Sequence, residues 1–328
     1  RVLYFNRDFR NHASSSNGKS GYSEDLGLGL KAIYESGFTQ GTVGFGVDAY
    51  AMQGIKLDSG KGRNGNGLFP TKGDGRAQDN YSEAGAAVKA RISNTTLKYG
   101  DQFVDVPVFS MDDSRLLPES TTGFFVTSEE LQNLELHAGH FTALNSMHQT
   151  ARDSANNGRL RSIDLIGGRY HFTENLSAAY YYADAELGHK GVDRMISKKQ
   201  YVNVSYLHPI ADDQSLSVDF NAYSTRYDYK TPNKDTGEQG IRKNNVQSLA
   251  VAYNIGAHTF TVARQQVEGN NDMGYDYGYD GGGSVYLAND IQVHGFHKKG
   301  ERSYQLRYDL DMAEFGVPGL TLMARYVR

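Results

Sequence analysis

The 328-residue chain has no cysteine, no tryptophan, only 6 prolines and no long run of apolar residues. Without cysteine it can form neither a disulfide framework nor a thiolate metal site. Without an apolar run of about 18 residues it offers no transmembrane helix. Its net charge of -4 lacks the basic excess of a nucleic-acid-binding domain, so we expect no nucleic-acid partner.

The chain is rich in glycine and tyrosine, with 37 Gly, 23 Tyr and 15 Phe. Such a composition is typical of proteins built from many β-strands. The mean hydropathy of -0.58 is low for a membrane protein. However, a β-barrel places its lipid-facing residues at every second position, so average hydropathy underestimates its membrane contact.

Apolar and polar residues alternate in segment after segment. In residues 215–223, Leu216 and Val218 alternate with Ser217 and Asp219, and this period of two predicts a strand with one apolar face. The same alternation occurs in residues 86–93, 201–207, 304–312 and 320–326. These segments predict an all-β fold in which one face of each strand is apolar and the other polar.

Short and long connections alternate between the predicted strands. The short turns lie at 35–40, 92–96, 172–177, 210–215, 254–259 and 314–319. The long polar segments are 10–24, 57–80, 101–121, 143–159, 188–199, 228–244 and 269–302. All long loops then emerge at one rim, as in a transmembrane antiparallel β-barrel of the outer membrane. This alternation also places residues 284–293, which could form a strand, inside the long loop.

About fifteen strands are predicted, whereas bacterial single-chain barrels have an even number and close on themselves. We therefore expect a single barrel domain over residues 1–328 whose closing strands are absent from this sequence. The alternative is a soluble β-sandwich, β-helix or sugar-binding protein, but a sandwich does not sort its loops by length.

Two motifs suggest other functions and are weak. Gly60, Gly62 and Gly65 match a dinucleotide-binding pattern, but the residues that follow cannot form the required helix. His137 and His140 face opposite sides of a strand and cannot chelate one metal ion. The chain lacks the GxSxG motif of hydrolases, although a catalytic triad assembles in space and an outer-membrane enzyme stays an alternative. We expect no enzymatic activity, metal or cofactor.

Tyrosines at strand ends predict the aromatic girdles of a membrane barrel. They are Tyr34, Tyr50, Tyr99, Tyr170, Tyr180, Tyr206, Tyr253, Tyr308 and Tyr326.

Basic residues on the polar faces point to the lumen of the predicted barrel. They are Arg7, Lys89, Arg91, Arg115, Arg159, Arg307 and Arg325. Guanidinium groups bind carboxylates in a fork geometry, and basic rings select anions in pores. Alternatively, each one only pairs with a wall acid such as Glu83, Asp309 or Asp311.

Several segments resemble the OprD family of outer-membrane porins, the Occ channels of pseudomonads. Among them are NRDFR (6–10), DSRLLPESTTGF (113–124), IGGRYHFTENLSAA (166–179) and RYDLDMAEFGVPGLTLMARYV (307–327). The resemblance extends over the whole chain in order. It implies an eighteen-stranded barrel with three strands missing here, located in the bacterial outer membrane, which takes up small carboxylate-bearing solutes.

The resemblance also implies roles for individual residues. The loop 101–121 folds inward and forms a constriction, with Arg115 in a basic ladder that conducts carboxylates. Arg7 is a second member, and Arg159 or Arg161 continues the ladder; alternation favours Arg159, because Arg161 is in phase with Ile163 and Leu165, which are expected to face outward. Asp112, Asp113 and Glu119 either orient the loop or form the opposite wall of the constriction.

The loop 269–302 resembles the second constriction loop of the family. Its expected lining residues are Tyr277, Ser284 and Asp290. Members that take basic amino acids carry acids where this chain has Gly283 and Gly295, and Asp290 offsets that loss only in part. The resemblance therefore favours simple or aromatic carboxylates, as in the OccK branch, and leaves a basic amino-acid channel as an alternative. Expected partners are these solutes, membrane lipid and lipopolysaccharide, and the barrel is expected to be a monomer or a weak oligomer.

Overall fold

The computed structural model describes residues 1–8, 22–60, 62–150, 152, 160–188, 194–232, 237, 239–274, 285–291 and 294–328. Fifteen strands form one antiparallel sheet in which each strand pairs with the next along the chain. These strands are β1 (Val2–Asp8), β2 (Tyr22–Glu35), β3 (Val43–Ser59), β4 (Asn80–Ile92), β5 (Thr95–Gln102), β8 (Ser120–Leu131), β9 (Leu134–Asn145), β10 (Leu160–His171), β11 (Leu176–Leu187), β12 (Met195–Ala211), β13 (Gln214–Tyr229), β14 (Gly240–Ile255), β15 (His258–Gly269), β16 (Arg302–Asp311) and β17 (Thr321–Val327).

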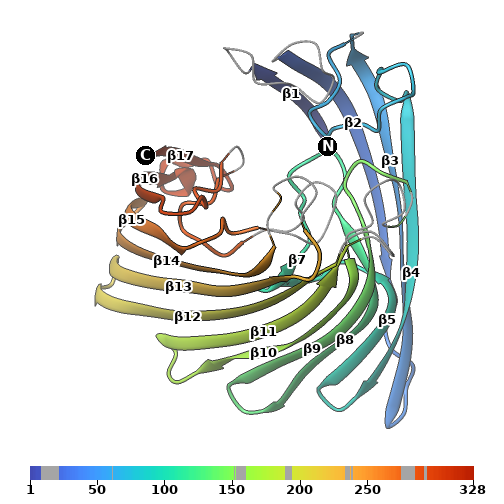
Figure 1. Ribbon diagram of the computed structural model, residues 1–328. Coiled ribbons are helices and arrows are strands. Elements are labelled where there is room, and N and C mark those ends of the chain that lie inside the picture. Colours follow the sequence, from blue (N-terminus) through green and yellow to red (C-terminus); the bar gives the residue numbers. More distant parts are fainter. Residues whose placement is uncertain are drawn as a thin grey trace.

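Two short strands, β6 (Asp105–Val106) and β7 (Phe109–Ser110), form a separate hairpin, and a 3-10 helix, η1 (Met312–Phe315), precedes β17. The large sheet is strongly curved, and the hairpin lies on its concave side (Figure 1). In the described residues β1 pairs only with β2, and β17 pairs only with β16. No helix in this part of the chain is long and apolar enough to cross a membrane.

The predicted all-β barrel architecture and the alternation of connections are confirmed. Hairpins such as β4–β5 and β12–β13 have two-residue turns, while long segments join β3 to β4, β5 to β8 and β15 to β16. The last of these joins Gly269 to Arg302, and its described residues 285–291 form no strand of the sheet. The segment between β5 and β8, which was expected to span 101–121, runs from 103 to 119.

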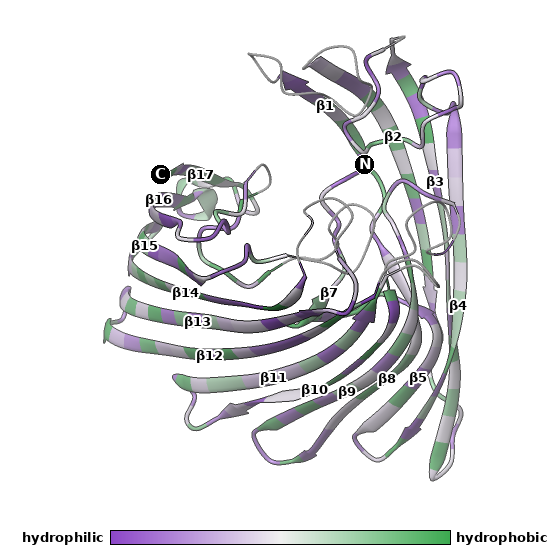
Figure 2. Cartoon of the chain, in the orientation of Figure 1, coloured by the Kyte–Doolittle hydropathy of each residue, from purple (hydrophilic) through white to green (hydrophobic). Residues whose placement is uncertain are grey.

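Each strand has one face toward the concave side, which we call the lumen face, and one outward face. On β12, Tyr201 and Asn203 on the lumen face are 1% and 2% exposed, whereas Val202 and Val204, which alternate with them, are both 39% exposed. Hydrophilic and hydrophobic residues accordingly alternate along the strands (Figure 2). Exposed apolar side chains on the convex side are what a lipid-facing barrel wall requires.

Part of the lumen face is apolar, and this overturns one sequence-based assignment. Ile163 and Leu165, expected to face outward, are 0% and 4% exposed and belong to a buried cluster with Val106 and Phe109 of the inner hairpin. Asp164 between them is exposed. A loop inside the barrel needs an apolar wall to pack against, so at this height apolar residues lie on the lumen face.

One predicted girdle tyrosine lies on the wrong side. Tyr34, Tyr180 and Tyr326 are exposed on the outward face, but Tyr50 is 6% exposed. Its hydroxyl donates to Glu83 Oε1 at 2.8 Å and lies 2.8 Å from Ser120 Oγ, so it belongs to a buried polar group at the start of β8.

Candidate functional site

The segment 103–119 between β5 and β8, which we call the first loop, is held against the lumen face at both of its ends. Val104, Val106, Val108 and Phe109 are all 1–2% exposed and pack on β9–β13. Leu116 and Leu117 are buried in a second cluster with Phe69 and the partly buried Leu3 and Phe5. Each such side chain contributes roughly 1.5–3 kcal/mol through burial. Met111 also packs against the first cluster, so the two apolar anchors leave residues 112–115 between them as the polar middle of the loop.

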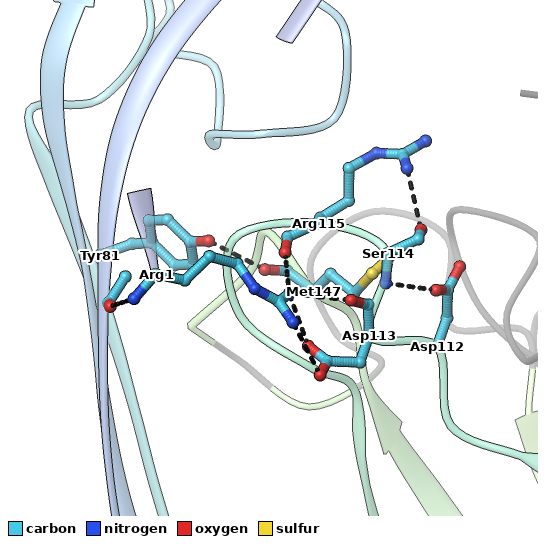
Figure 3. Close-up of polar contacts among 8 residues, drawn as sticks. Arg1, Tyr81, Asp112, Asp113, Ser114, Arg115 and Met147 are labelled. Atoms are coloured by element: carbon cyan, nitrogen blue, oxygen red, sulfur yellow. Dashed lines mark hydrogen bonds and ion pairs between the residues drawn. The ribbon is translucent and has the colours of Figure 1, made fainter. Parts of the chain in front are cut away.

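Arg115 lies in this polar middle, and its guanidinium points away from the neighbouring aspartates (Figure 3). Its Nη1 donates to Ser114 Oγ at 2.9 Å, and its Cζ lies 4.8 Å from the centre of the Phe5 ring. No carboxylate of the described residues lies within ion-pair distance of it. Among the described residues, Ser114 is the only one to which its guanidinium donates a hydrogen bond.

The acids beside Arg115 bind other groups. Asp113 accepts from Arg1 Nη1 at 2.9 Å and from Arg1 Nη2 at 3.1 Å. Arg1 Nη1 also donates to the carbonyl of Arg115 at 2.5 Å (Figure 3). Asp112 Oδ1 accepts from the Ser114 amide at 2.7 Å, and buried Glu119 accepts from the Asp112 amide at 2.9 Å. These contacts orient the loop, and none of these acids neutralises the positive charge of Arg115.

Arg7 approaches the same ring from β1. Its Cζ lies 5.2 Å from the centre of the Phe5 ring, so the guanidinium groups of Arg7 and Arg115 both contact Phe5. A cation over an aromatic face gains roughly 0.5–2 kcal/mol. Phe5 thus holds two cations close together, and the pair forms the most basic part of the site.

The other predicted basic residues do not join this pair. Lys89 and Lys98 both bind Asp48 at 2.5 Å, and Arg91 lies over Phe38 near a short turn. Arg307 makes a two-point contact with Asp309 at 2.7 Å, which is the wall pairing that the sequence left open.

The remaining ladder candidates are also separate from Arg115. Arg325 is on β17, at the edge of the sheet, in register with Arg307. Arg161 binds Glu186 at 2.8 Å beside a register shift at the start of β10. The shift breaks the alternation there, so the argument from alternation that favoured Arg159 over Arg161 is wrong. Arg159 lies outside the described residues.

The second loop joins β15 to β16 and contacts the first loop through Tyr286. The Tyr286 hydroxyl donates to Asp105 Oδ1 at 2.5 Å. Burial and this contact with Asp105 raise the pKa of Tyr286 well above its usual range, so the phenol stays a neutral donor. Asp290 is described and half-buried, whereas Tyr277, Gly283 and Ser284 lie outside the described residues.

Tyr223 of β13 links both loops to the wall. Its hydroxyl donates to the Pro107 carbonyl at 2.9 Å and accepts from the Tyr286 amide at 3.0 Å. It is 2% exposed, so water cannot replace these bonds without repacking.

Replacing Tyr223 by phenylalanine is therefore expected to loosen both loops together. The change removes the hydrogen bonds of a buried carbonyl and a partly buried amide, and the buried carbonyl alone costs about 1–3 kcal/mol. Single-channel recordings should show more open-state noise, and thermal unfolding should occur at a lower temperature. Tyr180→Phe is the control, because Tyr180 is exposed on the outward face. Equal noise in the two variants would contradict the linking role.

Two cavities lie beside the loops. One of about 680 Å³ is lined by the first loop, Tyr286 and Lys31 of β2, and its acids are Asp105, Asp112 and Asp113. The other, of about 490 Å³, lies under Tyr286 and is lined by Arg169, Arg307 and Asp219. Sequence reasoning did not select Lys31, Asp105 or Arg169. Arg169 is in phase with Ile163 and Leu165, which were expected to face outward, so only the structure places it beside a cavity.

The described residues contain no group of three or more metal-ligating side chains. His137 Nδ1 lies 2.9 Å from the Tyr181 hydroxyl, whereas His140 Nδ1 lies 2.7 Å from exposed Asp164. The two histidines thus have different partners on different faces of β9.

The comparisons with known proteins agree with this architecture. A family model described as "outer membrane porin, OprD family" matches residues 1–328. Porin D of Pseudomonas aeruginosa is 44% identical over 344 residues, which cover 100% of this chain and 71% of that protein.

Solved porin structures have the same fold. The crystal structure of OccAB1 of Acinetobacter baumannii matches with a TM-score of 0.87 and 34% identity over 99% of this chain and 77% of that chain. OpdK of P. aeruginosa, crystallised with vanillate, matches with a TM-score of 0.81 and 29% identity over 99% of this chain and 80% of that one. These relatives are channel proteins of the outer membrane rather than enzymes. The chain belongs to the OprD family of outer-membrane porins.

Proposed function

We propose that this porin admits small carboxylates by passive diffusion and that Arg115 binds the carboxylate group on its way through. The observation that carries the proposal is the guanidinium of Arg115. It is held by Ser114 and Phe5 and has no carboxylate partner in the described residues, while Arg1 occupies Asp113. A planar guanidinium donates two parallel hydrogen bonds to a carboxylate.

Two further features support this solute class. Arg7 adds a second positive charge at the same ring, and Arg169 and Arg307 line the cavity under Tyr286. OpdK, a relative in fold and sequence, was crystallised with vanillate, which is an aromatic carboxylate. Passage requires no chemical step: each contact must be weak enough for release, so the arginines act in succession and none binds tightly.

A second candidate solute carries a cationic group as well as the carboxylate. Asp105, Asp112 and Asp113 line the larger cavity with Lys31 as its one basic residue in the described part of the chain. Asp113 is neutralised by Arg1 and Asp105 is bound by Tyr286 and Ser110. Because these acids already have partners, we favour the simple carboxylate.

Block of single-channel current by matched solutes tests the proposal. Benzoate, benzamide and 4-aminomethylbenzoate share a ring and differ in charge. Benzoate is expected to interrupt the current of the full-length protein in a planar bilayer, whereas benzamide is not, since its neutral amide carries no negative charge and has only one acceptor oxygen. Equal block by benzamide would overturn carboxylate recognition. Stronger block by 4-aminomethylbenzoate would favour the second candidate.

A further inference from the structure

Three basic residues lie side by side on the outward face of neighbouring strands. Lys198 of β12 is directly opposite Arg226 of β13, and Arg226 is directly opposite Lys243 of β14. All three are exposed. The residues next to them along their strands face the lumen and are at most 2% exposed: Lys199, Thr225 and Asn244. The three cations, which we call the basic row, therefore point away from the solute path.

The basic row is electrostatically unfavourable by itself. Like charges directly opposite each other on one face of a sheet are destabilising. Asp184 of β11 offsets one charge, because its Oδ2 lies 3.0 Å from Lys198 Nζ. The side chains of Arg226 and Lys243 make no hydrogen bond or ion pair with any described residue. An anion supplied from outside the chain would relieve this repulsion.

The outward face beside the basic row changes in character along the strands. Uncharged polar residues come first: Gln200, Ser224 and Asn245, with Ser224 Oγ 2.8 Å from Asn245 Oδ1. Apolar residues follow, with Val202 and Val204 39% exposed and Leu249 44% exposed. From Lys198 to Val202 is four residues, or about 14 Å along the strand. Cation, neutral polar and apolar layers thus succeed one another in that order.

The basic row lies close to the rim formed by the long loops. Lys198 is near the start of β12 at Met195, and Arg226 is near the end of β13 at Tyr229. In outer-membrane barrels the long loops are extracellular. The apolar layer therefore faces the acyl chains of the outer leaflet, and the basic row lies at the level of its head groups.

We propose that Lys198, Arg226 and Lys243 form a binding site for the phosphate group of an outer-leaflet lipid. The uncharged polar groups of that lipid lie against Gln200, Ser224 and Asn245, and its acyl chains lie along Val202, Val204 and Leu249. Lys and Arg together bind phosphate as a point charge and a fork of donors. The apolar residues beyond the polar layer favour a lipid over free phosphate, because a lipid has acyl chains to lie against them and free phosphate has no apolar part.

The test compares lipid binding by two double variants of the full-length protein. Arg226→Gln with Lys243→Gln removes two charges of the basic row. Arg264→Gln with Arg302→Gln removes two charges from the outward face of β15 and β16, where each arginine is opposite a neutral residue, Tyr304 or Gln266. Native mass spectrometry in detergent would measure binding of purified lipid A and of its dephosphorylated form.

The basic-row variant is expected to bind lipid A about thirtyfold more weakly, because each cation near a lipid surface contributes about fivefold. The control variant, Arg264→Gln with Arg302→Gln, should bind lipid A as strongly as the parent does. The same is expected of Arg226→Lys with Lys243→Arg, which conserves both charges. Equal binding of dephosphorylated lipid A by the parent, an equal loss in the control, or complete displacement of lipid A by millimolar inorganic phosphate would each overturn the proposal. Channel conductance should be unaltered in the basic-row variant, which separates this site from the solute path.

Discussion

Replacing Arg115 by glutamate is expected to weaken current block by carboxylates strongly and to shift the channel's selectivity toward cations. The change puts an anion where the parent has a guanidinium that pairs with no carboxylate of the described residues, next to Asp112 and Asp113 in the same loop. Loss of a charge-assisted hydrogen bond costs about 1.5–3 kcal/mol, which corresponds to a blocking constant raised by about tenfold to hundredfold. Reversal potentials in a salt gradient and a benzoate titration measure both effects.

Two variants separate the role of Arg115 from a general effect of charge. Arg226→Glu makes the same substitution on the outward face and should leave selectivity and block unchanged. Arg115→Lys keeps the positive charge but loses the planar pair of N–H donors. The strength of benzoate block should therefore lie between that of the parent and that of the glutamate variant. If benzoate blocked the Arg115→Glu channel as strongly as it blocks the parent channel, Arg115 would not contact the solute.

The alternation of residues predicted the faces of the strands but not what lies against each face. For β12 and β13, whose lumen faces are polar, the predicted sides are correct. For β10 they are reversed at Ile163 and Leu165, because the first loop covers that part of the lumen with Val106 and Phe109. Tyr50 was misplaced for a related reason: its partner Glu83 is distant in sequence, and a tyrosine suits a lipid interface and a buried polar group equally well.

Partner choice was the other limit of sequence reasoning. Arg115 and Arg307 both lie in polar segments next to aspartates, and nothing local distinguishes them. Arg307 binds Asp309 two residues away, whereas Asp113 binds Arg1, 112 residues away in sequence. An arginine becomes available to solute only when a distant residue occupies its nearest acid, and such pairing is a property of the fold.

The first loop approaches β2 so closely that two glycines of β2 have no room for a side chain. A Cβ on Gly29 would lie 2.5 Å from the backbone oxygen of Leu116, and one on Gly27 would lie 2.7 Å from Cζ of Phe69 and 2.9 Å from Cδ2 of Leu116. At Gly29 the added Cβ meets a backbone oxygen, which cannot rotate aside. At Gly27 it meets the ends of two side chains, and these can rotate to make room.

Gly29→Ala is therefore expected to displace the first loop, and Arg115 with it. Normal contact distances require a shift of about 1 Å at Leu116, the residue next to Arg115. Overpacking of this kind costs about 1–3 kcal/mol, so thermal unfolding should occur at a lower temperature. Single-channel conductance and benzoate block should both change, because the guanidinium is held at Phe5 and Ser114 only through the position of this backbone.

Two other glycines make this a graded series. Gly27→Ala should change conductance less, because Phe69 and Leu116 can adjust their side chains. Gly37→Ala should have no effect, because a Cβ there meets nothing within 4 Å. Conductance should thus depart from the parent in the order Gly29, Gly27, Gly37. If Gly29→Ala had the same conductance and the same benzoate block as the parent, the first loop could move away from β2 without moving Arg115. The close approach of the loop to β2 would then have no part in positioning the guanidinium.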